Sequence, residues 1–228
     1  MIRFILFDLD NTILDFTAGE DIALKTVFRD FGLEPSPEVI DRYLEINKGL
    51  WEGLEEGRVT REELSVERFS RLFSEFNISC SGKEVAKAYE KLLSFQHPFI
   101  PGAEEILREL SPHYELYIAS NGTSEIQWRR IRDAKLERWF KGIFISEDMG
   151  VNKPDTGFFE KAFSEIEGFT KDQTLIVGDS LTSDIRGGRD AGIHTCLFAP
   201  GELPEREDIR PEYVIRKLSE LPGMLSEM

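Results

Sequence analysis

An apolar run at the start of the chain has no strand partner in the segment that follows it. The run covers residues 2–9 and is almost continuous, as in strands of parallel sheets that are buried on both faces. Residues 16–97 then read as helices, so the strands that pair with this run must come from later in the chain. We therefore expect one sheet made from both ends of the sequence, with a helical segment inserted between them.

The segment 16–97 has the apolar spacing of amphipathic helices. The pattern i, i+3, i+4, i+7 occurs twice, at Leu24, Val27, Phe28 and Phe31 and again at Phe69, Leu72, Phe73 and Phe76. Helix starts are indicated by Ser36-Pro37 and by the capping boxes Thr60-x-x-Glu63 and Ser81-x-x-Glu84. Four such helices without a strand predict a small bundle, joined to the rest of the chain by hinges near 15–19 and 96–102.

Beyond residue 100, short apolar runs alternate with helical patterns. Candidate strands are 116–120, 142–145, 174–177, 195–198 and 213–215, and helices are expected to begin near 101, 123, 154 and 181. Such alternation favours a parallel sheet covered by helices on both faces. The predicted fold is a doubly wound α/β core of residues 1–15 and 98–228 with a helical cap of residues 16–97. The charged stretch 202–210 is expected to be a surface loop.

Composition narrows the classes of partner. The formal charge of −15, from 28 basic and 43 acidic residues, argues against a nucleic-acid polymer or an anionic membrane. Cys80 lies in a polar turn and Cys196 in an apolar strand, so we expect no disulfide framework and a reducing compartment. The chain starts directly with a strand, and no apolar run is long enough to cross a membrane. A cytoplasmic monomer or homodimer is predicted.

Polar side chains stand at or just beyond four of the predicted strand ends. They are, in chain order, Asp8 with Asp10, Ser120-Asn121-Gly122, Lys153, and Asp179 with Asp184. Because the carboxyl ends of parallel strands share one edge of a sheet, these groups are expected to converge. Neighbouring acids repel each other unless a cation or a shared proton holds them. The pattern suggests a divalent metal, a nucleophile beside an acid/base, or both.

Each of these groups also has a purely structural interpretation. The run Asp-x-Asp-Asn-Thr is suited to turns and helix caps, and Ser-Asn-Gly is an ordinary turn tripeptide. Proline after Lys153 fits the first position of a helix, and acids such as Asp179 and Asp184 are favoured near helix N-termini. Four such groups in order, each at the same predicted sheet edge, favour a functional site instead.

In this order the motifs resemble those of haloacid dehalogenase-like phosphohydrolases with a helical cap inserted after the first motif. The matching positions are Asp8-x-Asp10-x-Thr12, Ser120, Lys153 and Gly178-Asp179-x-x-x-x-Asp184. The resemblance implies that Asp8 is a nucleophile and that Asp10 is a general acid and base. It also implies a Mg²⁺ ion held by Asp8, the Asp10 backbone carbonyl and Asp179, with Asp184 orienting these ligands.

The resemblance extends to the substrate. It implies a phosphate-binding group of Thr12, Ser120, the backbone near Asn121 and Gly122, and Lys153, and it makes Lys153 a catalytic residue beside Asp8 and Asp10. The stretches 47–64, 120–127 and 145–150 are most similar to bacterial pyrimidine 5′-nucleotidases, which implies hydrolysis of nucleoside monophosphates. A phosphatase of sugar phosphates or phosphoglycolate is the alternative, because similar caps serve those substrates. A phosphomutase would keep the same motifs, whereas 2-haloacid dehalogenases typically lack the second acid of the first motif.

Overall fold

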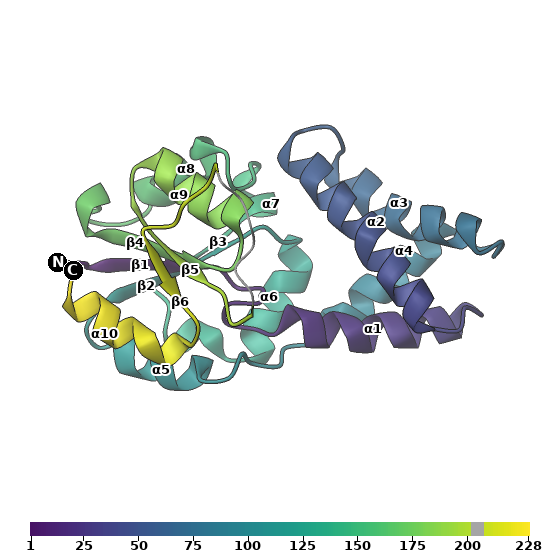
Figure 1. Ribbon diagram of the computed structural model, residues 1–228, viewed down its shortest axis with the longest axis horizontal. Helices are drawn as coiled ribbons and strands as arrows, with labels where there is room; N and C mark the ends of the chain where they lie inside the picture. Colours follow the sequence, from purple (N-terminus) through teal and green to yellow (C-terminus); the bar gives the residue numbers. More distant parts are fainter. Residues whose placement is uncertain (202–207) are drawn as a thin grey trace. The chain divides into compact units, whose positions relative to one another are not determined.

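The computed structural model describes residues 1–201 and 208–228, so most of the charged stretch 202–210 lies outside the described residues. The chain divides into two compact units (Figure 1). The first unit contains residues 1–16 and 97–228, and the second contains residues 17–96. None of the described helices is long and apolar enough to cross a membrane.

The first unit is built on a six-stranded parallel sheet with the order β3-β2-β1-β4-β5-β6. The strands are β1 (Phe4–Phe7), β2 (Glu115–Ser120), β3 (Gly142–Ile145), β4 (Thr174–Gly178), β5 (His194–Phe198) and β6 (Tyr213–Ile215). The N-terminal strand β1 therefore pairs with β2 and β4, both of which lie more than 100 residues later in the chain. The predicted α/β sheet is confirmed.

Strand β1 is shorter than the apolar run that predicted it. The run covers residues 2–9, but the ladder ends at Phe7 because the chain then bends into a turn. In this turn the carbonyl of Leu9 accepts hydrogen bonds from the amides of Ile13 and Leu14. All four residues of β1 are buried, so the continuous apolar pattern correctly indicated a strand covered on both faces.

Helices cover both faces of the sheet (Figure 1). Their bounds are α5 (Ala103–Leu110), α6 (Ser124–Asp133), α7 (Ser146–Met149), α8 (Thr156–Ser164), α9 (Arg186–Ala191) and α10 (Leu221–Ser226). On one face α5, α6 and α10 pack against alternate strand residues such as Ile5 and Phe7. On the other face α8 and α9 pack against Phe4 and Leu6. This alternation is the two-residue period of a strand.

Helix α8 begins close to the expected position 154, but the structural interpretation that places Pro154 at its first position is wrong. Pro154 does not occupy the first helical position but precedes α8 in a turn, and its peptide bond with Lys153 is cis. The helix begins at Thr156 instead, because the Asp155 side chain caps it by accepting a hydrogen bond from the amide of Gly157 at 2.8 Å.

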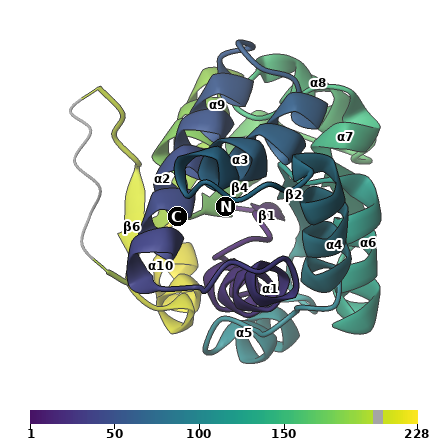
Figure 2. The same cartoon turned by 90° about the vertical axis from the view of Figure 1, so that its right-hand side faces the viewer.

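The second unit consists of helices, and the structure shows no strand within residues 17–96. The helices are α1 (Phe16–Asp30), α2 (Pro37–Glu55), α3 (Arg61–Glu75) and α4 (Gly82–Leu93), and α3 lies between α2 and α4 (Figure 2). Thr60 and Glu63 form the capping box at the start of α3. Aromatic rings from all four helices fill the interior, namely Phe28, Tyr43, Phe69, Phe73 and Tyr89.

Candidate active site

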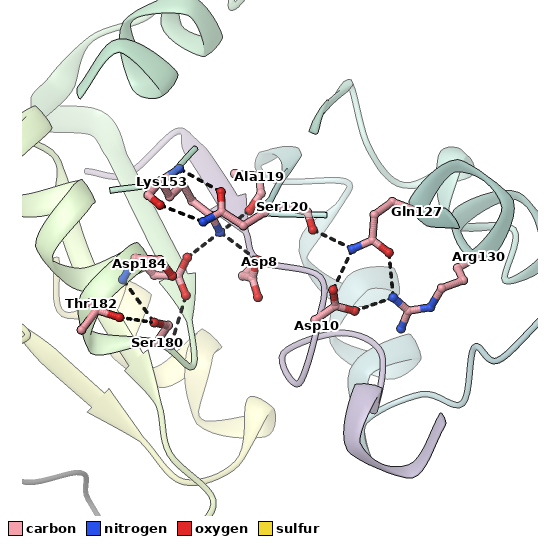
Figure 3. Close-up of polar contacts among 12 residues, drawn as sticks. Asp8, Asp10, Ala119, Ser120, Gln127, Arg130, Lys153, Ser180, Thr182 and Asp184 are labelled. Carbon is pink, nitrogen blue, oxygen red and sulfur yellow. Dashed lines mark hydrogen bonds and ion pairs between the residues drawn. The ribbon is translucent and has the colours of Figure 1, made fainter. Parts of the chain in front are cut away.

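Lys153 lies at the centre of the polar groups that converge on the carboxyl edge of the sheet (Figure 3). Its ammonium is 2.8 Å from Asp8 Oδ1, 2.6 Å from Asp184 Oδ1 and 2.5 Å from the carbonyl oxygen of Ala119. An ammonium has three donors, so these contacts use all of them. Contact between Lys153 and a phosphoryl group would therefore require exchange of one of these partners.

The loop that carries Lys153 is fixed by the polar turn after β2. The Asn121 side chain donates to the carbonyl of Lys153 and accepts from its amide, both at 2.8 Å. This pair of hydrogen bonds joins two loops that are 32 residues apart in the chain. The side chain of Asn121 thus holds the lysine loop, while the predicted phosphate contact at this position concerned the backbone amide.

Three carboxylates gather beside Lys153. Oxygens of Asp8, Asp179 and Asp184 all lie within 4.8 Å of one another. Burial raises the pKa of Asp8 to about 7; the Lys153 charge opposes this shift, while Asp184 and Asp10 add to it. Burial and the charges of Asp8 and Asp184 also raise the pKa of Asp179 well above its usual value. When ionised, the buried Asp8 and Asp184 and the partly buried Asp179 outnumber the one ammonium, and this excess negative charge fits a hard divalent cation with oxygen ligands.

Asp184 is the most enclosed member of this group. Its side chain is fully buried, with Oδ1 on Lys153 and Oδ2 accepting from the amide of Ser180 at 3.1 Å. A side chain at Gly178 would collide with it, because a Cβ there would lie 2.2 Å from Asp184 Oδ2. The glycine before Asp179 is therefore required by the close approach of Asp184. Since both oxygens of Asp184 already have protein partners, the geometry agrees with a role in orienting its neighbours.

Asp10 points toward α6 rather than toward Lys153 (Figure 3). Its Oδ1 lies 2.5 Å from Arg130 Nη1, and its Oδ2 accepts from Gln127 Nε2 at 2.7 Å. Gln127 Nε2 also donates to Ser120 Oγ at 2.8 Å, which links the predicted acid/base to the predicted phosphate-binding hydroxyl.

Sequence reasoning missed Gln127 and Arg130 as site residues. The available signal was their spacing, since positions i and i+3 of a helix share one face and α6 follows directly after the Ser120 turn. Without the fold, however, nothing showed that Arg130 is 1% exposed and so must find a carboxylate partner.

Two predicted phosphate-binding positions are buried beneath this edge. Thr12 is fully buried, and its hydroxyl has no hydrogen-bond partner among the described residues. Gly122 packs so closely on α6 that a Cβ there would lie 2.3 Å from Gln127 Cγ. The structure thus brings Asp8, Asp179, Asp184 and Lys153 into one cluster and Asp10 with Ser120 into another. It does not expose the Thr12 hydroxyl.

Comparison with known families agrees with this geometry. Residues 5–198 match the family model of haloacid dehalogenase-like hydrolases. The chain belongs to this family. It is therefore a hydrolase, and the match includes Asp8, Asp10, Ser120, Lys153 and the acids after β4.

Individual members of the haloacid dehalogenase-like family align with this hydrolase along nearly its whole length. It is 42% identical to the HAD-hydrolase YfnB of Bacillus subtilis, over 98% of this chain and 95% of the relative. It is 40% identical to the pyrimidine 5′-nucleotidase PynA of Streptococcus pneumoniae, over 99% and 95%, and 30% identical to YjjG of Escherichia coli, also named a pyrimidine 5′-nucleotidase, over 97% and 96%.

Solved structures of family members show the same fold. The crystal structure of Bacillus subtilis YfnB bound to magnesium superposes with a TM-score of 0.94 at 42% identity and covers 98% of both chains. An L-2-haloacid dehalogenase from Xanthobacter autotrophicus reaches a TM-score of 0.81 at 18% identity over the full length of both chains. The second likeness concerns the fold alone, because identity at that level does not carry the reaction.

Proposed function

We propose that this hydrolase is a Mg²⁺-dependent phosphomonoesterase that forms a phospho-aspartate at Asp8, with pyrimidine nucleoside 5′-monophosphates as its substrates. The observation that carries the proposal is the cluster in which the carboxylates of Asp8, Asp179 and Asp184 outnumber the single ammonium of Lys153. The expectation of a small-molecule phosphomonoester substrate and a cytoplasmic location belongs to the same proposal, as does the assignment of residues 16–97 as a cap domain.

The metal requirement rests on the donors present. Asp8, Asp179 and the backbone carbonyl of Asp10 would hold the ion, and Asp184 would orient them through Lys153 and the Ser180 amide. When bound, Mg²⁺ neutralises negative charge on the phosphoryl oxygens and on the attacking carboxylate. The crystal structure of Bacillus subtilis YfnB is of a magnesium-bound protein, which supports Mg²⁺ as the ion.

Two displacements at phosphorus follow from the residue types. In the first, a carboxylate oxygen of Asp8 forms a bond to phosphorus, the bond from phosphorus to the leaving oxygen breaks, and Asp10 gives that oxygen a proton. In the second, water attacks phosphorus, the bond to Asp8 breaks and Asp10 takes the proton of the water. Inorganic phosphate leaves, and Asp8 and Asp10 return to their starting forms.

The contacts of Lys153 favour attack by Asp8 on phosphorus. Burial alone would lower the pKa of Lys153, but the charges of Asp184 and Asp8 raise it, so the ammonium stays protonated. A permanent positive charge 2.8 Å from Asp8 favours the ionised carboxylate that attacks. The Ser120 hydroxyl at the end of β2 would then donate to a phosphoryl oxygen.

The nucleotide preference is supported by the relatives. PynA and YjjG are both named pyrimidine 5′-nucleotidases and align over almost the whole chain, including the helical unit. A glyceraldehyde 3-phosphate phosphatase of Pyrococcus furiosus also aligns, at 27% identity over 98% of this chain, so sugar phosphates are the second candidate substrates.

A phosphate-release screen tests both levels of the proposal. UMP, dUMP and dTMP should give the highest kcat/KM, EDTA should abolish turnover, and added Mg²⁺ should restore it. A hexose phosphate or phosphoglycolate whose kcat/KM exceeds that of every nucleotide by about tenfold corresponds to roughly 1.4 kcal/mol of transition-state preference. Such a result would refute the proposed substrate class but not the proposed phosphatase activity. Full activity in EDTA would overturn the metal requirement, and transfer of phosphate between sugar positions would indicate a mutase.

A further inference from the structure

Three buried side chains, those of Arg130, Gln127 and Ser120, form a hydrogen-bond network with Asp10, whose own side chain is 27% exposed (Figure 3). Arg130 Nη1 donates to Asp10 Oδ1 at 2.5 Å and to Gln127 Oε1 at 2.7 Å. Gln127 Nε2 donates to Asp10 Oδ2 at 2.7 Å and to Ser120 Oγ at 2.8 Å. Arg130, Gln127 and Ser120 are each no more than 2% exposed, so water cannot reach these three side chains without local opening.

The inventory of donors fixes the orientation of the Gln127 amide. Arg130 has only donors, so the atom it contacts on Gln127 must be the carbonyl oxygen, and the NH₂ group must face Asp10 and Ser120. Its two hydrogens then serve those two acceptors. Because Ser120 Oγ accepts a hydrogen bond here, its own hydroxyl proton has to point elsewhere, and it remains to be donated to a phosphoryl oxygen.

The same network leaves only certain lone-pair positions of the Asp10 carboxylate available for a proton. Each carboxylate oxygen accepts one strong hydrogen bond, one of them from a charged donor, and keeps a second lone-pair site. A proton carried by Asp10 can therefore occupy only the remaining positions, which limits the directions from which it can be delivered. Loss of Arg130 would allow the carboxylate to turn and would remove this restriction.

We propose that Gln127 and Arg130 are positioning residues that align the acid/base Asp10 and the phosphate-binding hydroxyl of Ser120 as one unit. The inference rests on the proposed phosphomonoesterase function. Arg130 acts mainly on proton delivery by Asp10, and Gln127 acts on both Asp10 and Ser120. The alternative is a structural role, in which the buried arginine only anchors α6 to the edge of the sheet.

Leaving groups of different basicity separate these roles. An alkyl phosphate such as UMP needs protonation of its leaving oxygen, whereas nitrophenyl phosphate needs little. Since kcat/KM reports the steps up to cleavage of the ester bond, Arg130→Met should lower it for UMP on the order of 100-fold and for nitrophenyl phosphate by less than about tenfold. Arg130→Lys keeps a charged donor and should recover part of the UMP activity.

Phosphate binding gives a second readout that does not involve proton transfer. Gln127→Met keeps the size of the side chain but removes the donor to Ser120, so inhibition by inorganic phosphate should weaken several-fold in this variant. Arg130→Met should leave the phosphate inhibition constant nearly unchanged. The matched control is Arg129→Met on the same helix, because Arg129 is exposed and pairs with Asp133 at 3.6 Å; it should change neither readout.

The outcomes are distinguishable. A wild-type protein that hydrolyses neither ester with Mg²⁺ refutes the proposed function, and with it this inference. An active wild type whose Arg130→Met and Arg130→Lys variants lose both activities equally refutes the inference alone and leaves a structural role. Where Arg130→Met fails to fold, the ratio of the two activities in Arg130→Lys decides, because a displaced Asp10 should still impair UMP more than nitrophenyl phosphate.

Discussion

Each of the two units buries charged side chains, but the balance of charge in the two clusters differs. In the first unit, Asp8, Asp179 and Asp184 surround the single ammonium of Lys153. In the helical unit, the buried Arg68 forms an ion pair with Glu90 at 3.9 Å, and its charge also interacts with that of the buried Glu20. The hydroxyls of Tyr43 and Tyr89 lie at 3.5 and 2.9 Å from Glu20 Oε1.

The helical cluster satisfies itself with its own residues. Arg68 lies over the rings of Tyr89 and Phe69 at 4.6 and 5.2 Å, and burial raises the pKa of Tyr89 so that its hydroxyl keeps the proton it donates to Glu20. The cluster beside Lys153 has excess negative charge instead. The comparison shows that buried charge by itself does not indicate a functional site. Negative charge that the chain's own cations do not balance indicates that a cation is bound there.

The largest expected effect is the loss of activity in Asp8→Asn. An amide cannot replace the attacking carboxylate, so kcat should fall on the order of 10⁴-fold or more with any phosphomonoester. In the helical cluster, Glu20→Gln should leave kcat for nitrophenyl phosphate within several-fold of wild type below its unfolding temperature. Steady-state assays of both variants test the contrast, and Asp8→Asn within about tenfold of wild type would contradict it.

Next in size is the loss of stability in Arg68→Met. Removing this charge breaks the ion pair with Glu90 and takes away the favourable interaction with the buried Glu20, which costs about 3–5 kcal/mol of unfolding free energy. The control on the same helix is Arg71→Met, whose ion pair with Glu67 is about half exposed and is worth about 0–1 kcal/mol. Urea unfolding curves of the two variants compare them. Equal midpoints would show that the helical cluster contributes no more than an exposed pair.

A smaller expected effect is that the stabilisation of the protein by Mg²⁺ depends on pH. With a folded-state pKa of about 7 against an ordinary value of 3.8, Asp8 in the metal-free protein binds more protons when folded than when unfolded over that range, so metal-free stability should fall as pH rises toward 7. Protons and Mg²⁺ compete for the same carboxylate. The gain in unfolding free energy on adding Mg²⁺, followed as a rise in Tm, should therefore be larger near pH 8 than near pH 6. For a tenfold change in affinity the difference is about 1.4 kcal/mol when the ion is well above its Kd at both pH values. A gain that is equal at both pH values would oppose this interpretation.

The smallest expected effect is a gain in stability, opposite in sign to the loss expected for Arg68→Met. In EDTA near neutral pH, Asp179→Asn removes one of three repelling carboxylates and should raise the unfolding free energy by roughly 1 kcal/mol. Asp172→Asn, at an exposed position, should change little. Calorimetric Tm values of the metal-free proteins provide the measurement. A lower Tm for Asp179→Asn would mean that its charge is already compensated within the chain.

The sequence was sufficient for the sheet because strand patterns and motif order depend on local residues. The run before Asp8 is apolar at every position of β1, and the motifs after β2 and β4 stand directly at strand ends. These features led to the fold and the family, and both were confirmed.

Features that depend on contacts across the sheet edge could not be predicted in this way. The Arg130–Asp10 pair joins residues 120 positions apart, and the Lys153–Asp8 pair joins residues 145 positions apart. Pro154 looked like a helix start because its fixed backbone angle suits that position, yet the Asp155 cap decided where α8 begins. The roles of the individual site residues stay predictions until they are measured.

Binding of beryllium fluoride to Asp8, followed by fluorine NMR, tests the central claim most directly. The complex mimics a phosphoryl group on a carboxylate and reports an equilibrium, so it does not depend on which step limits turnover. A bound fluorine resonance should appear in the wild-type protein with Mg²⁺, vanish in EDTA and be absent from Asp8→Asn. A bound resonance that persists in Asp8→Asn, or a wild-type protein that gives none with Mg²⁺, would contradict the account.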